Sequence, residues 1–280
     1  MFTGKICTSV IVSLAVLGSS AGTMRAAAAT TVYDSNGFES FSDGGLPTQN
    51  GGQGVVANWF DFGAGTGGSS TATVFTDAGL AASGNKAVRI DRDGDDGALG
   101  LTGFGVPLPT APQERFVFIE FDLNAIDING DSAFGPAFGI ELFTTGNNQV
   151  GGVGIDAGDG SLWRYNSETE VLFPIGGLQR GVYQDWKITV DLVTEKYSVA
   201  VAGNTLATFD FYNAPPFDFG FGDRLIDVSI VTFATDGNFA DVEGIAYIDN
   251  YVVTTSQVPE PTSMMALLVA GGTLLARRRR

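Results

Sequence analysis

The chain has 280 residues, of which 44% are hydrophobic and 21 are Phe, and this is enough apolar material for one sizeable core. Its 31 acidic and 15 basic residues give a formal charge of −16, which disfavours binding to nucleic acid or to anionic lipid. His is absent and Cys7 is the one cysteine, so imidazole triads and zinc sites of the usual ligand sets are excluded.

The first 29 residues have the three parts of a secretory signal peptide. Lys5 supplies the positive charge, residues 6–18 form an apolar run, and small residues lead to Ala28 and Ala29, near which we expect cleavage. The apolar run of about 13 residues is too short to cross a hydrocarbon core of about 30 Å, so we expect a short signal helix and no permanent anchor here. Cys7 precedes this run, which argues against a lipoprotein and removes the one thiol from the mature chain.

Residues 30–257 are expected to form one domain. Nine basic and thirty acidic residues give this body a formal charge of −21, which suits solubility outside the cell or the binding of divalent cations. Apolar and polar residues alternate with a period of two, and helical periodicity is lacking. The strands predicted on this basis are 55–62, 71–76, 87–91, 116–123, 137–143, 150–155, 161–165, 185–192, 197–201, 205–211, 226–234 and 245–253.

The clearest alternation lies at 185–192, where Trp186, Ile188 and Val190 share one side of the predicted strand. A tight turn at Gly203-Asn204 then joins two further strands. Strands spaced by roughly ten to fifteen residues, with Gly, Asn and Asp between them, are typical of sandwiches and jelly rolls. The sequence therefore predicts an all-β, antiparallel β-sandwich of the jelly-roll type.

Two segments of the body carry a family resemblance. Residues 183–203 resemble the paired central strands of concanavalin A-like (LamG-like) jelly rolls, and Tyr247-Ile248-Asp249-Asn250-Tyr251-Val252-Val253 resembles their final strand. That group includes lectins, adhesive modules, glycoside hydrolases and polysaccharide lyases, so the resemblance implies a fold and leaves the activity open.

Glu120, Asp122 and Asn124 are predicted to share one face of a strand. Laminarinase-like hydrolases of this fold carry a Glu-x-Asp-x-Glu run whose two glutamates act as nucleophile and acid/base. Asn124 replaces the second glutamate and cannot donate a proton at a useful pKa. We therefore expect no catalytic residue here, and interpret Glu120 and Asp122 as solvent-facing side chains or as part of a sugar-binding groove.

A cluster of carboxylates follows the predicted strand 87–91. Asp91, Asp93, Asp95 and Asp96 could supply oxygen ligands for calcium, the one cofactor that the composition suggests. The loop lacks the glycine position and the bidentate Glu of an EF-hand, so a solvated acidic turn is the alternative. Residues 127–131 form a second, weaker candidate of the same kind.

Aromatic side chains that stack on sugar rings are a second type of candidate. Trp163, next to Arg164 and Tyr165 in a hairpin-like segment, is predicted to be exposed and, with Tyr165, to bind ligand. Trp186 is assigned to the core, and Trp59 is left open. The glycine-rich stretch 154–160 is followed by no helix, which argues against a phosphate site.

The last 23 residues resemble the PEP-CTERM sorting signal of Gram-negative envelope proteins, which implies processing by an exosortase. An apolar run at 264–276, expected to form a short hydrophobic helix, enters the membrane, and the basic end stays in the cytoplasm. The signal comprises Pro259, Glu260, Pro261, Arg277, Arg278, Arg279 and Arg280.

These features together predict an exported cell-envelope or extracellular-matrix protein with transient membrane association. Its body is interpreted as a non-catalytic module that binds polysaccharide. Two alternatives stay open: a glycoside hydrolase or polysaccharide lyase on the same fold, and a purely structural surface or biofilm protein.

Overall fold

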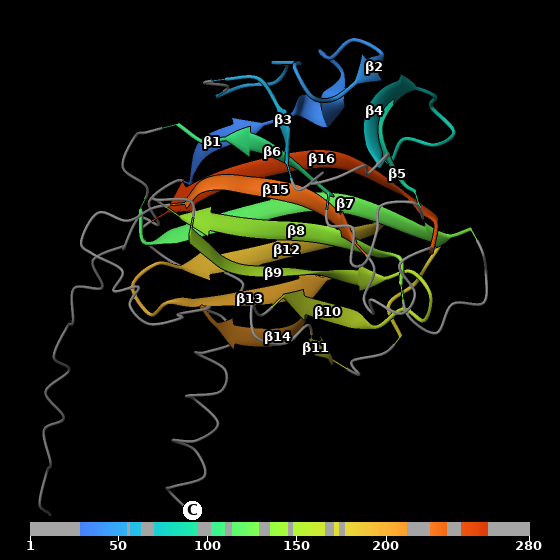
Figure 1. The fold of residues 1–280 in the computed structure, drawn as a ribbon. Coiled ribbons are helices and arrows are strands. Elements are labelled where there is room, and N and C mark those ends of the chain that lie inside the picture. The colour runs from blue at the N-terminus through green and yellow to red at the C-terminus, as the bar shows by residue number, and fades with distance from the viewer. Residues whose placement is uncertain are drawn as a thin grey trace, which may run out of the picture.

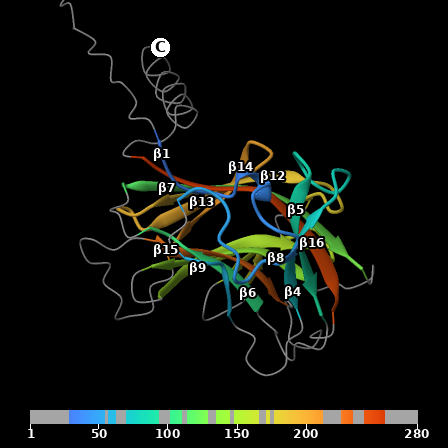
Figure 2. The same ribbon diagram turned by 90° about the horizontal axis from the view of Figure 1, so that it is seen from above.

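The computed structural model describes residues 29–54, 57–62, 70–93, 102–109, 114–128, 135–144, 148–165, 171–173, 177–211, 225–233 and 242–256. These residues form two antiparallel sheets packed face to face (Figure 1). Figure 2 shows the sheets as two layers. The prediction of an all-β antiparallel sandwich of the jelly-roll type is confirmed.

Sheet A has nine strands, with β1 paired to β16 beside the main path. In spatial order the main path contains β14 (Asn204–Asp210), β13 (Lys196–Val201), β12 (Gln184–Asp191), β7 (Phe116–Asp127), β16 (Gly244–Ser256), β5 (Lys86–Arg92), β4 (Thr71–Thr76) and β2 (Gly44–Gly45), and β1 spans Thr30–Asp34.

Sheet B has seven strands. In spatial order they are β11 (Val171–Phe173), β10 (Leu162–Tyr165), β9 (Asn148–Asp156), β8 (Ala137–Thr144), β15 (Leu225–Phe233), β6 (Thr102–Pro107) and β3 (Phe60–Phe62). One short 3₁₀ helix, η1 (Asn36–Phe38), follows β1 among the described residues.

The core lies between the sheets and is built by the alternation that the sequence contains. Trp186, Ile188 and Val190 are fully buried on the inner side of β12, as predicted. Trp186 stacks on Phe121 of the neighbouring β7, with ring centroids 6.0 Å apart. Tyr251 of β16 donates a 2.8 Å hydrogen bond to the carbonyl oxygen of Val228, so a core side chain also ties sheet A to sheet B.

The predicted meander β12–β13–β14 is present, with a small shift in its turn. Val201 pairs with Asn204, so the two loop residues are Ala202 and Gly203, and both have positive φ (49° and 75°). Positive φ at both loop positions is the geometry of the hairpin turns that match the twist of the strands. The turn therefore lies one residue earlier than Gly203-Asn204.

Four strands were not predicted, namely β1, β2, β6 and β11. β6 (Thr102–Pro107) reads TGFGVP, and its glycines hide the alternation because they carry no side chain to mark a face. The strand predicted at 55–62 is shorter in the structure, where β3 covers Phe60–Phe62.

The predicted helices of the leader and tail, and all sorting-signal residues, lie outside the described residues. Within the described part of the chain, no helix is long and apolar enough to span a membrane.

Candidate functional site

The candidate site lies on the outer face of sheet B, the face turned away from sheet A. Ile140 and Leu142 of β8 point into the core, as do Val228 and Ile230 of β15. Side chains alternate along a strand, so Glu141, Asp227 and Ser229 lie on the opposite, outer face. Glu141 pairs in register with Ser229, and Asp227 is the next residue of β15 on that face.

The two carboxyl groups are buried although they lie on an outer face. Glu141 is 1% exposed and Asp227 is 8% exposed. The Ser229 hydroxyl donates a 2.7 Å hydrogen bond to Asp227 Oδ2. Asp227 Oδ1 and both carboxyl oxygens of Glu141 accept no hydrogen bond of good geometry. Buried polar atoms without partners are rare in native folds, so these carboxyl groups stand out among the buried residues.

Burial changes the proton affinity of both groups. Burial is the main cause that raises the pKa of Glu141 to about 8, the Gln149 side chain lowers it, and the charge of Asp227 raises it further. Burial also raises the pKa of Asp227 to about 6, with the Ser229 hydrogen bond opposing the rise. At neutral pH the pair therefore consists mainly of a protonated Glu141 and an ionised Asp227.

Three aromatic rings stand next to Asp227. Phe60, Phe62, Phe143 and Asp227 are the described residues that line a hollow of about 240 Å³. The rings of Phe62 and Phe143 meet edge to face, with centroids 5.7 Å apart. The hollow thus combines an apolar wall with one carboxylate, a combination found in small-ligand sites.

Glycines in β6 make room for the two β3 rings. A Cβ atom on Gly103 would stand 2.2 Å from Cζ of Phe62, and one on Gly105 would stand 2.6 Å from Cζ of Phe60. Any larger residue would displace a ring, so these glycines let the rings lie close against the sheet. The same glycines that concealed β6 in the sequence are therefore required for the aromatic wall.

Trp163 corrects one prediction, because it is buried and not exposed. Its side chain is 2% exposed, and its Nε1–H donates a 3.2 Å hydrogen bond to the carbonyl oxygen of Phe138. The ring lies against Gly139 and Gly154, where added Cβ atoms would come within 2.7 Å of it. Gly139 and Gly154 face each other on neighbouring strands and leave a space that Trp163 fills. The alternation of residues in the sequence does not reveal which glycines face each other.

The backbone of Tyr165 pairs with Gly152, and its side chain lies outside the described parts. Trp59 is buried as well, at 1% exposure.

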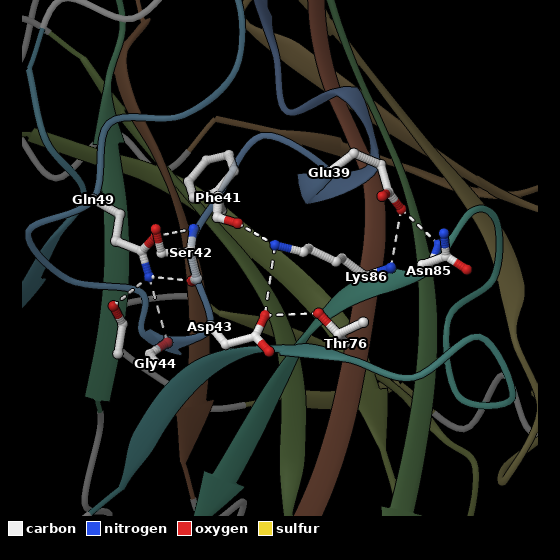
Figure 3. Close-up of polar contacts among 10 residues, drawn as sticks. Glu39, Phe41, Ser42, Asp43, Gly44, Gln49, Thr76, Asn85 and Lys86 are labelled. Atoms are coloured by element: carbon white, nitrogen blue, oxygen red, sulfur yellow. Dashed lines mark hydrogen bonds and ion pairs between the residues drawn. The ribbon is translucent and has the colours of Figure 1, made fainter.

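A polar clamp joins the segment after η1 to β5 and to the turn before it (Figure 3). Lys86 Nζ donates a short hydrogen bond to the carbonyl oxygen of Phe41 and forms an ion pair of 3.5 Å with Asp43. Glu39 Oε1 accepts hydrogen bonds from the backbone N–H groups of Asn85 and Lys86, at 2.6 and 2.9 Å. The clamp therefore fastens the segment after η1 to β5 and to the turn that precedes it.

Gln49 extends the clamp toward β3. Its amide nitrogen donates to the carbonyl oxygens of Ser42 and Gly45 at 3.0 and 2.8 Å, and its amide oxygen accepts from the Ser42 N–H (Figure 3). The backbone of Gln49 accepts from the Trp59 N–H at 2.8 Å. Because Trp59 directly precedes Phe60, the clamp positions the aromatic wall.

A second hollow of about 440 Å³ lies beside the clamp. Its described lining residues are Ser40, Phe41, Ser42, Gln49, Asn50, Gly51 and Gly52.

Glu120 and Asp122 lie on the other side of the sandwich, on the outer face of sheet A. Glu120 forms an ion pair of 2.7 Å with Lys187, and Asp122 accepts a 2.7 Å hydrogen bond from Asn250 Nδ2. Half-buried Asn124 follows on the same face, as predicted. Neither carboxylate belongs to the hollow on sheet B. Their predicted orientation is confirmed, and a ligand role stays a prediction.

The Asp-Asn pair of the last strand has a structural role. Asp249 is fully buried and accepts backbone hydrogen bonds from Ser83 at 2.9 Å and from Asn250 at 2.7 Å. Asn250 has a φ of 52°, and the register of β16 against β7 shifts between Asp249 and Val252. The pair therefore forms a β-bulge that fastens the loop preceding β5. Burial is the main cause that raises the pKa of Asp249, opposed by these backbone hydrogen bonds.

The candidate calcium ligands are only partly within the described residues. Asp91 Oδ1 accepts a hydrogen bond of 2.9 Å from Arg89 Nε, and the Asp93 backbone donates to Ser70 Oγ at 3.1 Å. Asp95 and Asp96 lie outside the described residues, as does most of the second candidate turn. In the part of the chain that is described, no group of three or more acidic residues is arranged to hold a metal ion.

Glu141 and Asp227 were missed by sequence reasoning. Each interrupts an apolar strand, in AFGIELF and LIDVSIV, and a single carboxyl between apolar neighbours is the signal that could have singled them out. Which strands pair, and therefore that the two carboxyls are neighbours, is decided by contacts between distant parts of the chain.

No protein-family model matches the chain, and no curated protein matches it. Among solved structures, the cellulose induced protein Cip1 has a TM-score of 0.49 at 12% identity, covering 71% of this chain and 91% of that one. The endo-β-1,4-glucuronan lyase from the fungus Trichoderma reesei has a TM-score of 0.46 at 12% identity, with 77% and 95% covered. The family 7 alginate lyase A1-II′ has a TM-score of 0.45 at 13% identity, with 67% and 83% covered. Likenesses of this degree assign neither an activity nor a substrate to this chain.

Proposed function

We propose that this protein is an exported, non-catalytic module that binds polysaccharide in the hollow on the outer face of sheet B. The observation that carries the proposal is the pairing of the aromatic wall of Phe60, Phe62 and Phe143 with Asp227 in one hollow. The C–H faces of a sugar ring pack on aromatic rings, and its hydroxyls need fixed acceptors and donors. Among the described residues that line the hollow, Asp227 offers an acceptor for such a hydroxyl.

The test is a thermal melt of the full chain against a panel of polysaccharides, combined with an assay for released sugar. A ligand that binds only the folded state raises the melting temperature, by an amount set by its concentration relative to the dissociation constant. A rise without product supports the binding module. The variants Phe143→Ala and Asp227→Asn should reduce the rise, whereas Asp185→Asn on the outer face of sheet A should not.

A second candidate function is a carbohydrate-active enzyme. The observation that favours it is the position of two buried carboxyls on neighbouring strands, Glu141 opposite Ser229 and Asp227 two residues from it. Burial raises the pKa of Glu141 to about 8 and that of Asp227 to about 6, and glycosidases use one protonated and one ionised carboxyl that flank the glycosidic bond. Release of reducing sugar by the wild type and its loss in Glu141→Gln would establish this function over the first. If no glycan is bound or cleaved, a structural envelope role is the remaining account.

The route to the cell surface is proposed from the two ends of the sequence. The leader directs export, and the Pro259-Glu260-Pro261 segment with its apolar run and Arg277 to Arg280 directs sorting by an exosortase-type enzyme. Mass spectrometry of the exported protein tests both steps. Termini near Ala29 and near Pro259 support the route, and an intact chain in the membrane fraction contradicts it.

Calcium binding by the segment containing Asp91, Asp93, Asp95 and Asp96 is also retained as a proposal. Asp91 is engaged with Arg89, so a calcium ion would have to compete with that side chain. Melts with calcium and with chelator test it directly. A calcium-dependent rise that disappears in Asp95→Asn/Asp96→Asn supports the site.

A further inference from the structure

The charged residues on the outer face of sheet B are acidic in the described strands. They are Glu141, Asp227 and Asp156, which ends β9 and accepts hydrogen bonds from the backbone N–H groups of Gly135 and Gly158. Asp61 of β3 alternates with Phe60 and Phe62 and so points away from them. β6, which packs between β15 and β3, carries no charged residue.

The one basic residue in the described strands of sheet B faces the other way. Arg164 of β10 lies on the same side of its strand as the core residue Leu162. Its guanidinium stands over the Phe209 ring, 4.8 Å from the centroid, and Nη2 donates a 3.1 Å hydrogen bond to the Asp210 carbonyl oxygen. Arg164 is therefore bound to β14 of sheet A and is not available to a ligand in the hollow.

Asp227 is the polar residue among the described residues that line the hollow, and it suits a hydroxyl. Its carboxylate accepts hydrogen bonds and donates none. A sugar hydroxyl can donate to it, whereas Glu141 is 1% exposed and lies behind the lining of the hollow. A carboxylate of a uronic acid has no proton to donate to Asp227 and brings a second negative charge beside it.

We propose that the hollow selects neutral polysaccharides, whose hydroxyls donate to the Asp227 carboxylate while their rings pack on the aromatic wall, and that Asp227 excludes polyuronates by charge. This inference rests on the proposed function, since it specifies the ligand class of the same site. Aromatic packing supplies the sugar contact, and the Asp227 carboxylate supplies the discrimination.

The experiment measures the affinity of the full chain for a neutral β-glucan, a xylan, alginate and polygalacturonate, at pH 7 and physiological ionic strength. At least one neutral polymer should bind tenfold or more tightly than either polyuronate. The whole chain is acidic, so the local effect is isolated by two variants that each remove one negative charge. Asp227→Asn should gain about tenfold in polyuronate affinity, whereas Asp185→Asn, on the opposite sheet, should gain little.

A measurement on the unmodified chain covers the case in which Asp227→Asn does not fold. At pH 5 Asp227 is largely protonated while polyuronates stay charged, so polyuronate binding by the wild type should strengthen relative to pH 7. Binding to a polyuronate in preference to all neutral polymers at pH 7 overturns the inference and leaves the proposed function standing. Binding to none of the polymers overturns the proposed function itself.

Discussion

Glu141 and Asp227 stand on neighbouring strands of sheet B with both side chains on its outer face, Glu141 opposite Ser229 and Asp227 two residues away from that position. Burial raises the pKa of both carboxyls, and the charge of Asp227 adds to the rise at Glu141. Burial of these two carboxyl groups lowers the free energy of unfolding, since a charged group is unfavourable in the protein interior. Its effects on stability can be measured without knowing the ligand.

Glu141 should make the protein less stable as the pH rises. In the unfolded chain the carboxyl loses its proton near pH 4.5, and in the folded chain near pH 8, so the folded state holds more protons between these values. The free energy of unfolding therefore falls across this window, by about 1.4 kcal/mol for each pKa unit at most. Urea denaturation at pH 5, 6, 7 and 8 measures the slope.

Glu141→Gln should remove most of that slope because the amide does not titrate. The matched control is Glu120→Gln, which changes a partly exposed glutamate, paired with Lys187 on the outer face of sheet A, and should leave the slope in place. If Glu141→Gln and Glu120→Gln have the same pH profile as the wild type, the burial of Glu141 does not govern the effect.

Gly139→Ala should destabilise the fold by overpacking. A Cβ atom there would stand 2.2 Å from the Val153 carbonyl oxygen and 2.7 Å from Trp163, in the narrow space between β8 and β9. Substitutions of this kind cost about 1–3 kcal/mol. Gly45→Ala is the control, since no atom lies within 4 Å of its added Cβ. Equal urea midpoints for the two variants would show that Trp163 and β9 can shift to make room for the added Cβ atom.

Lys86→Met should loosen the clamp without touching the hollow. Lys86 Nζ bonds Phe41 and Asp43, and hydrogen bonds to charged groups contribute about 1.5–3 kcal/mol. We expect a lower free energy of unfolding and faster proteolysis within residues 39–54. Glycan affinity should also fall, because the clamp positions Phe60 and Phe62.

Lys196→Met provides the comparison. Lys196 pairs with Asp210 at the exposed edge of sheet A, where the two side chains are 49% and 78% exposed. Exposed pairs contribute about 0–1 kcal/mol, so this variant should behave like the wild type in all three assays. A loss of affinity in Lys196→Met as large as in Lys86→Met would contradict the role of the clamp.

Asp249→Ala should free the loop before β5. Asp249 is buried and accepts the Ser83 and Asn250 backbone N–H groups, and buried donors left without a partner cost about 1–3 kcal/mol. Hydrogen exchange should accelerate at Ser83 while the β12–β13 pair stays protected. Uniform acceleration across the sandwich would indicate a global loss of stability and not a local one.

Sequence patterns alone predicted the architecture and much of the core. Period-two alternation correctly assigned Trp186, Ile188 and Val190 to the inner face of one strand and Glu120 and Asp122 to the outer face of another. This works because the side-chain period of a strand is a local property of the backbone. The absence of His likewise determined which chemistries are excluded.

The candidate site was decided by tertiary structure. Alternation shows which residues share a face, but it does not show what lies against that face, so Trp163 was expected in solvent and is buried on Gly139 and Gly154. Glu141 and Asp227 are 86 positions apart in the sequence numbering and become neighbours only because β8 pairs with β15. Pairing between distant strands depends on the packing of the whole sandwich. For this reason the sequence by itself determined the fold class, whereas the tertiary structure decided that the carboxyl pair and the aromatic wall lie on one face of sheet B.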